Sequence, residues 1–392
     1  MNATSLLEPA TARRLAVRGS LGVLVLLSLG HFFVDLYSGA LGALQPALVE
    51  RLGLSLTQAG ILGGLFVFSS SLMQPVYGFL SDRYHTKLFA ALAPAVAAIG
   101  IAGLPLAPGY GWLLALAAFG GAGVAAFHPQ ASAAVAAASS LRRGAWMAIF
   151  ISAGTLGFAL GPIYFSEAVA RLGLEGAWWA AVPGVLVTLF LLVQLPAPAG
   201  PARRRHFDWA PLRAVWKPLT ILYLLVFIRS IVQVTFAQFL PLYLMLERGF
   251  SYAASSYALA LYLAAGALGG FIGGHLADRW GGKRVILFSM IGSLPFLLLF
   301  FLAGGATALF GLAVGGLILL FTIPVNVVMA QELVPAQAGT VSSLMMGFAW
   351  GMAGLVFIPL VGRASDVFSM HAVLMALLAF PLAGFLLALK LR

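Results

Sequence analysis

The stretch GFLSDRYHTK, residues 78–87, occurs in this chain in two related copies. The second copy is GHLADRWGGKR, residues 274–284, and its Asp278 follows Asp82 of the first copy by 196 residues. Residues upstream of each copy keep nearly the same offset: Pro46, Glu50 and Arg51 recur as Pro241, Glu247 and Arg248. A repeat of this length in a chain of 392 residues predicts a fold built from two related halves.

The composition indicates the solvent in which these halves fold. Hydrophobic residues make up 62% of the chain, charged residues 8%, and the mean hydropathy is +1.03. Soluble domains have roughly 45–50% apolar and about 25% charged residues, so a water-soluble fold could not bury this much apolar surface. The apolar runs have the length of about 20 residues that spans a bilayer as a helix. We therefore expect an all-α membrane protein.

Twelve apolar segments are predicted to be transmembrane helices. Their expected limits are 20–48, 55–81, 88–106, 111–138, 142–170, 177–196, 217–246, 252–277, 284–303, 306–331, 337–364 and 370–390. A proline- and arginine-rich stretch separates the sixth segment from the seventh. We therefore predict two pseudo-symmetric six-helix halves, an N-terminal bundle over 1–196 and a C-terminal bundle over 217–392, joined by a cytoplasmic linker over 197–216. Duplicated helical halves are typical of secondary transporters.

The distribution of lysine and arginine predicts the orientation. Seventeen of the 22 basic residues lie on one side of the predicted spans, four lie on the other, and Arg229 lies within a span. Because basic loops stay in the cytoplasm, we expect a multi-pass protein of the inner membrane with both termini cytoplasmic. The net charge of +11 belongs to these loops, so no nucleic-acid partner is expected. The chain has no cysteine, which excludes disulfides and thiolate metal sites.

The duplicated loops resemble the cytoplasmic signature of the major facilitator superfamily, Gly-x-x-x-Asp-Arg after the second and eighth spans. The first copy departs from that pattern at His85 and Thr86. The resemblance implies alternating access, with a cytoplasmic gate between the halves, and a plain basic turn is the alternative. The predicted gate residues are Gly78, Asp82, Arg83, Lys87, Gly274, Asp278, Arg279 and Lys283.

A narrower resemblance, to the fosmidomycin-resistance-type efflux family, is carried by three segments. They are His31-x-x-x-Asp35, Phe127-His128-Pro129-Gln130-Ala131, and Arg229-Ser230 with Phe239-Leu240-Pro241-Leu242-Tyr243. Gln130 stands where that family usually has glutamate. Gly157, Gly161 and Pro162 resemble the superfamily's antiporter motif without its trailing glycine pair, and ordinary close helix packing explains them equally well. The resemblance implies efflux of antibiotics.

Ionisable residues within the predicted spans mark the candidate site, because intramembrane charges are costly and usually face a hydrated path. His31 and Asp35 lie four residues apart and share one helix face. Asp35 is the expected proton carrier, and His31 and His128 are proton-coupling candidates because imidazole titrates near neutral pH. A buried pair that only fixes helix packing is the alternative. The resemblance implies that spans one, four, seven and ten line a central cavity.

Arg229 is the main candidate for substrate binding. Its planar guanidinium suits an anionic group, and a structural counter-ion to Asp35 is the alternative. The other predicted substrate contacts are Gln130, Tyr37, Gln233, Asn326 and Thr322. Farther out, pairs among Glu167, Arg171, Glu175, Arg363 and Asp366 suggest solvated rim contacts or an outer gate.

These patterns predict a proton-coupled exporter of small molecules such as antibiotics or organic anions. An uptake symporter or facilitator on the same fold is the alternative. A lipid-modifying enzyme is disfavoured because the catalytic motifs that such chemistry needs do not occur. His31 and Asp35 offer two metal ligands, but the sequence shows no third ligand nearby, so neither a metal nor a cofactor is predicted. The expected partners are a small-molecule substrate, protons and the lipid bilayer, with the chain a monomer.

Overall fold

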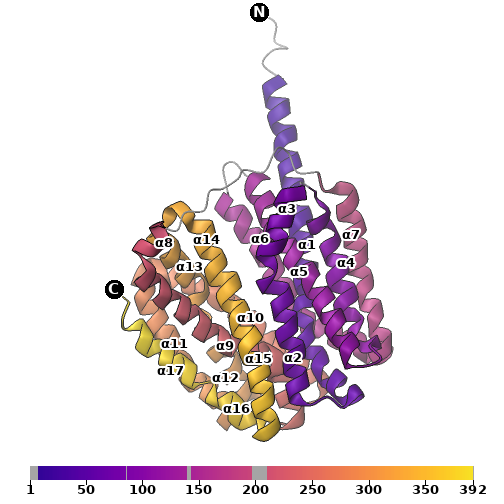
Figure 1. Ribbon diagram of the computed structural model, residues 1–392, viewed down its shortest axis with the longest axis vertical. Helices are drawn as coiled ribbons and strands as arrows, with labels where there is room; N and C mark the ends of the chain where they lie inside the picture. Colours follow the sequence, from indigo (N-terminus) through magenta and orange to yellow (C-terminus); the bar gives the residue numbers. More distant parts are fainter. Residues whose placement is uncertain (1–7, 85, 139–142, 197–209, 392) are drawn as a thin grey trace, which may run out of the picture.

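The computed structural model describes residues 8–84, 86–138, 143–196 and 210–391. Within these ranges the regular elements are all helical, which confirms the predicted class. Two groups of helices lie side by side, α1–α7 and α8–α17, and we call them the first half and the second half (Figure 1). Most of the predicted linker, 197–209, lies outside the described residues, so the predicted domain boundaries stay a prediction.

The first half contains seven α-helices and three shorter helical elements. They are α1 (Glu8–Leu52), α2 (Leu56–Val67), η2 (Phe68–Leu72), α3 (Gln74–Tyr84), α4 (Leu88–Ala102), η3 (Leu104–Leu106), α5 (Tyr110–Ala138), α6 (Arg143–Gly176), η4 (Ala177–Ala181) and α7 (Val182–Gln194).

The second half begins with a short helix and then continues with long ones. Its elements are α8 (Ala210–Ala214), α9 (Trp216–Leu246), α10 (Tyr252–Trp280), α11 (Gly282–Leu302), α12 (Gly305–Leu319), α13 (Thr322–Leu333), η5 (Pro335–Gln337), α14 (Ala338–Ser343), η6 (Leu344–Phe348), α15 (Ala349–Val367), α16 (Met370–Ala376) and α17 (Ala379–Ala388). We call the end of the bundle where α1 and α9 begin the linker end. The opposite end, where α2 and α10 begin, is the distal end.

Ten helices in the described part of the chain are long and apolar enough to cross a membrane. One of them, Gly144–Gln194, is a run of 51 residues interrupted at Gly173, whose φ of 73° is not helical. Dividing this run at Gly173 and adding the 15-residue apolar helix Leu88–Ala102 gives the twelve expected segments. The difference from twelve thus comes from the kink at Gly173, which joins two segments in one run, and from the short helix Leu88–Ala102.

Glycines allow α1 to pack closely against α6. A Cβ atom at Gly157 would overlap the carbonyl oxygen of Phe32, and one at Gly161 would overlap that of Leu36. On the other side of the contact, a Cβ at Gly39 would overlap the carbonyl oxygen of Phe158. Small residues at such contacts let membrane helices gain packing energy where lipid supplies no hydrophobic force. The structure therefore gives this motif a packing role, and its exporter role stays a prediction.

The halves meet along α2 and α15, which lie side by side in Figure 1. A Cβ at Gly60 would lie 2.7 Å from the carbonyl oxygen of Ile358, so the two backbones approach closely there. Each half also has its own hydrophobic core, one built from residues between 24 and 195 and one from residues between 219 and 391. A third core joins Ala43 and Ala159 of the first half to the second half.

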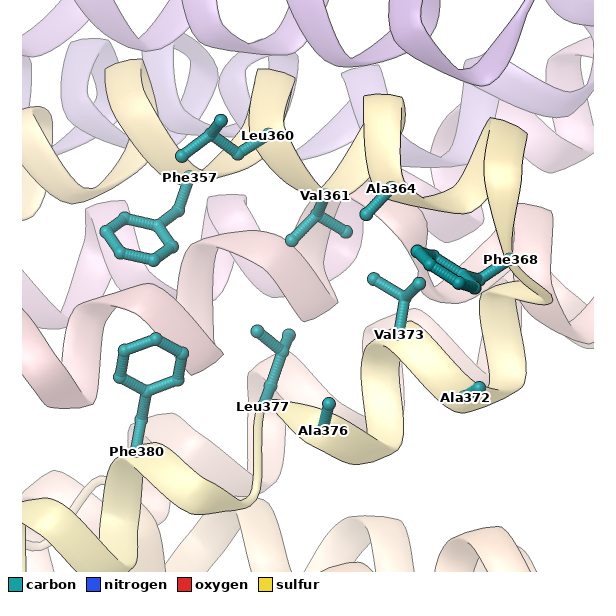
Figure 2. Close-up of a pocket in the computed structure, with 10 residues that line it drawn as sticks. All are labelled: Phe357, Leu360, Val361, Ala364, Phe368, Ala372, Val373, Ala376, Leu377 and Phe380. Atoms are coloured by element: carbon teal, nitrogen blue, oxygen red, sulfur yellow. The ribbon is translucent and has the colours of Figure 1, made fainter.

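An apolar groove of about 430 Å³ lies between α15 and the α16–α17 segment (Figure 2). The side chains that line it are all hydrocarbon and include Phe357, Phe368 and Phe380. This groove presents no group that could orient a polar substrate.

Candidate functional site

The carboxylate of Asp35 lies between two imidazole rings. His31 Nε2 lies 3.2 Å from Asp35 Oδ2, and His128 Nε2 lies 3.4 Å from Asp35 Oδ1. His31 and Asp35 are one turn apart on α1, whereas His128 comes from α5, which packs against α1. The fold thus brings His128, a proton-coupling candidate from the sequence, into contact with Asp35.

The other ring nitrogens of both histidines are held by backbone carbonyl groups. His31 Nδ1 lies 2.8 Å from the Phe150 carbonyl oxygen, and His128 Nδ1 lies 2.8 Å from that of Val124. A carbonyl oxygen only accepts hydrogen bonds, so each Nδ1 carries the proton and each Nε2 faces Asp35. The orientation of both rings is therefore set by the backbone.

The surroundings of the cluster are aromatic on one side and open on the other. The ring of His31 stacks on Phe150, with centroids 4.2 Å apart, and a Cβ at Gly154 would overlap the His31 ring. The exposed fraction of the side chain rises from 7% for His31 through 17% for Asp35 to 26% for His128. His128 is therefore the most accessible member of the cluster.

Phe150 and Gly154 belong to this site although no motif in the sequence marked them. Gly154 precedes Gly157 and Gly161 on the same helix, so the three glycines form one stripe of small residues facing α1. Extending the pattern of small residues by one turn from Gly157 would have indicated Gly154.

A second polar site lies in the second half, at Arg229 on α9. Arg229 is 5% exposed, and one guanidinium nitrogen donates a hydrogen bond to Gln233 Oε1. Its Nε has no hydrogen-bond partner, and no carboxylate among the described residues lies within ion-pair distance. The structure therefore does not pair Arg229 with Asp35.

Arg229 and Gln233 line a cavity of about 210 Å³. The other lining residues are Val226, Ile323, Val327, Met345, Met346 and Trp350. The cavity thus has one cationic and one amide group set in an apolar wall, an arrangement typical of small-molecule sites.

Two further predicted substrate residues lie in α13, which contributes Ile323 and Val327 to this cavity. Asn326 and Thr322 are fully buried. The Thr322 hydroxyl donates to the Leu319 carbonyl oxygen at 3.4 Å, whereas neither amide atom of Asn326 has a partner in the described part of the chain. Their substrate contact stays a prediction.

Gln130 uses its amide to fasten the segment between α3 and α4. Its Oε1 accepts a hydrogen bond from the Ala90 N–H at 2.7 Å, and its Nε2 donates to Ser81 Oγ at 2.7 Å and to the Thr86 carbonyl oxygen. All polar atoms of this side chain are therefore engaged within the first half. This arrangement favours a structural role over the predicted substrate contact.

Tyr37 is likewise engaged within the first half. Its hydroxyl donates to the Ala180 carbonyl oxygen and accepts from the Gly184 N–H, both at 2.9 Å, and the side chain is fully buried. It joins α1 to the η4–α7 segment and lies away from Arg229 in the other half. A packing role accounts for it.

The duplicated loops make equivalent contacts in the two halves. Lys87 Nζ donates to the carbonyl oxygens of Leu192 and Leu195 at the C-terminal end of α7, and Lys283 Nζ donates to those of Leu389 and Leu391 just after α17. Close approach to a proline is also repeated, at Gly78 to Pro129 and at Gly274 to Pro324. These contacts stay within each half, so a gate that joins the halves stays a prediction.

Contacts between the halves occur at the distal end. Asp366 on α15 accepts hydrogen bonds from the backbone N–H groups of Leu56 and Thr57, at 2.8 and 2.9 Å, and from the Thr57 hydroxyl. Glu167 on α6 accepts from the Tyr257 hydroxyl on α10 at 2.8 Å and pairs with Arg171 at 3.0 Å. The charge pattern of the sequence indicated the two acidic residues but not Thr57 or Tyr257, because each of these contacts joins segments that lie far apart in the chain.

Comparison with known proteins agrees with this architecture. The family model of the Major Facilitator Superfamily matches residues 27–359. The chain is 30% identical over 384 residues to the fosmidomycin resistance protein of Escherichia coli K12, covering 96% of this chain and 94% of that protein. It is also 30% identical over 374 residues to the uncharacterized MFS-type transporter YfnC of Bacillus subtilis 168, covering 93% and 91% of the two chains.

Solved transporter structures share the fold at low sequence identity. A bacterial homologue of the human lysosomal transporter Spinster, in an inward-facing and unoccupied conformation, superposes with a TM-score of 0.79 at 17% identity, covering 95% of this chain and 98% of that chain. The nucleoside transporter NupG superposes with a TM-score of 0.73 at 12% identity, covering 95% and 100%. The protein is a multi-pass membrane transporter and not an enzyme. With the family model matched over most of its length, the chain belongs to the major facilitator superfamily.

Proposed function

We propose that this transporter exports small organic anions from the cytoplasm in exchange for protons. The observation that carries the proposal is the buried guanidinium of Arg229, which lines a cavity and has no carboxylate partner among the described residues. A buried charge is normally paired, because desolvation otherwise costs several kcal/mol. An anionic substrate would supply the missing charge.

The remaining cavity wall supports an organic anion as the substrate. A guanidinium binds a carboxylate, phosphate or phosphonate through two parallel hydrogen bonds. The apolar side chains of Met345, Met346 and Trp350 would contact a nonpolar body attached to that group. Methionine side chains are flexible enough to fit several shapes, which suits an exporter of more than one compound.

The cluster of His31, Asp35 and His128 is the proposed proton carrier. With both Nδ1 protons held by carbonyl groups, each of the two contacts between Nε2 and the carboxylate has room for one proton. The charge of the cluster therefore runs from −1 without added protons to +1 with two.

The cluster and Arg229 lie on helices that pack against each other across the two halves. Asp35 belongs to α1 and Arg229 to α9, and α1 contacts α9 where Gly42 approaches the Ala237 carbonyl group. A change of charge in the cluster can therefore act on the half that binds the anion. Export as the direction is supported by the 30% identity to a fosmidomycin resistance protein.

Transport by the purified protein in liposomes tests the proposal. With an imposed pH gradient, we expect wild-type liposomes to transport the phosphonate fosmidomycin against its concentration gradient. Arg229→Gln should remove saturable transport, since the anion loses the one charged side chain that lines the described cavity. Arg213→Gln is the matched control because Arg213 is exposed on α8, outside the cavity.

The outcome that contradicts the proposal is saturable transport of anions that Arg229→Gln leaves unchanged. Direction is tested in cells: expression should lower sensitivity to the toxic anion if the protein exports, and raise it if the protein is an uptake symporter.

A further inference from the structure

We propose that His31, Asp35 and His128 form a binding site for a divalent transition-metal ion of the zinc type. Ligand atoms from the three side chains lie within 4.8 Å of one another, on two helices of the first half. The proposal goes beyond proton-coupled anion export, and the binding itself does not depend on that function.

The separations between the ligand atoms fit an ion. Zinc bonds to imidazole nitrogen at 2.0–2.1 Å and to carboxylate oxygen at 2.0–2.2 Å, which places neighbouring tetrahedral ligands about 3.3–3.4 Å apart. The two contacts involve different carboxylate oxygens, 3.2 Å from His31 Nε2 to Oδ2 and 3.4 Å from His128 Nε2 to Oδ1, and one ligand atom from each of the three side chains lies within 4.8 Å of the others. The three side chains therefore converge closely enough for one ion to contact all of them.

The second ring nitrogens provide the support that metal ligands usually have. A histidine that binds a metal normally donates its other N–H to a carbonyl oxygen or a carboxylate, which fixes the tautomer and turns the ligand nitrogen toward the ion. Both histidines do so here, His31 to Phe150 and His128 to Val124. Because Gly154 has no side chain, the His31 ring can lie directly against α6 at this position.

The donor set selects the class of ion. Two imidazoles and one carboxylate suit zinc and similar first-row ions, whereas calcium and magnesium prefer oxygen ligands. Three protein ligands leave one tetrahedral position for water or for a substrate oxygen. The partial exposure of His128 gives an ion a way in. The carboxylate offsets one of the two charges, which lowers the cost of holding the ion within the bundle.

Occupancy by the ion has a consequence for transport that rests on the proposed function. The ion would use the same two nitrogen atoms and the same carboxylate that the proposed protons use. Zinc should therefore inhibit pH-driven transport, and a chelator should restore it.

Direct binding to the purified full-length protein in detergent tests the site. We expect Co²⁺ to bind with a stoichiometry of one per chain, to give the strong visible absorption of a tetrahedral ion, and to be displaced by Zn²⁺. Removing a ligand with Asp35→Asn or His128→Gln should weaken binding by more than about 100-fold, since outer-shell changes alone cost 10–100-fold. His275→Gln is the matched control, because His275 is exposed on α10 in the second half. Size-exclusion profiles show whether each variant is folded.

A variant that keeps all three ligands but shifts one of them distinguishes an effect on the geometry of the site from loss of folding. Gly154→Ala should displace the His31 ring and weaken Co²⁺ binding while the protein remains folded. The inference is overturned if wild type does not bind Co²⁺ or Zn²⁺, or if Asp35→Asn and His128→Gln bind them as wild type does. Anion transport that persists in such a protein would leave the proposed function standing. Binding with the expected loss in the variants, in a protein without transport, would support the site and remove the proposed function.

Discussion

Asp366 in the second half caps the first turn of α2 in the first half, where Thr57 offers it both a backbone N–H and a hydroxyl group. A carboxylate at a helix N-terminus satisfies free N–H groups and interacts favourably with the helix dipole. This contact joins the halves at the distal end, so an alternating-access mechanism that opens this end would have to break it.

Asp366→Ala should therefore favour the form that is open at the distal end. Loss of such a cap costs about 1 kcal/mol, a shift of about fivefold between the two forms. Spin labels at Glu50→Cys and Val367→Cys can measure the distance between the halves, because the chain has no native cysteine. We expect a longer distance to gain population. A distribution identical to that of the parent would show that the cap does not control opening.

The glycine contact between α1 and α6 makes a prediction about stability. Gly157→Ala forces a methyl group against the Phe32 carbonyl group, and overpacking of this kind costs roughly 1–3 kcal/mol. We expect a lower midpoint of thermal unfolding in detergent. Gly144→Ala on the same helix is the control, because a Cβ there meets no atom within 4 Å. Equal midpoints for the two variants would contradict the packing role.

Gln130 makes a prediction about the segment between α3 and α4. Gln130→Glu introduces the glutamate that the fosmidomycin-resistance-type family usually has at this position. A carboxylate cannot donate a hydrogen bond to the Thr86 carbonyl group. We expect faster amide hydrogen exchange around Thr86 and Ala90 than in wild type. Gln194→Glu, at an exposed position of α7, should leave that exchange unchanged. Unchanged exchange in Gln130→Glu would mean that the amide does not hold this segment.

The overall fold could be predicted from two features of the sequence. The length of the apolar runs indicates the membrane spans, and the duplicated loops indicate the two halves. The equivalent bonds of Lys87 and Lys283 show that the repeat reflects a repeated contact and not only a repeated topology.

The site could be predicted only in part. His31 and Asp35 share a helix face, so their contact follows from a spacing of four. The contact of His128 with Asp35 depends on which face of α5 packs against α1. Both helices are almost uniformly apolar within the predicted spans, so the sequence does not determine that face. For Gln130 the motif predicted a contact with substrate, whereas in the structure its amide forms hydrogen bonds within the first half.

Asp35→Asn tests the coupling step. The substitution preserves the shape of the side chain but removes the carboxylate that attracts protons between His31 and His128. We expect transport driven by a pH gradient to be lost, whereas counterflow of substrate, which needs no net proton movement, should persist. Measuring both activities in the same liposomes separates coupling from folding, because a misfolded variant loses both. Accumulation at the wild-type level with this variant would show that the protons cross elsewhere.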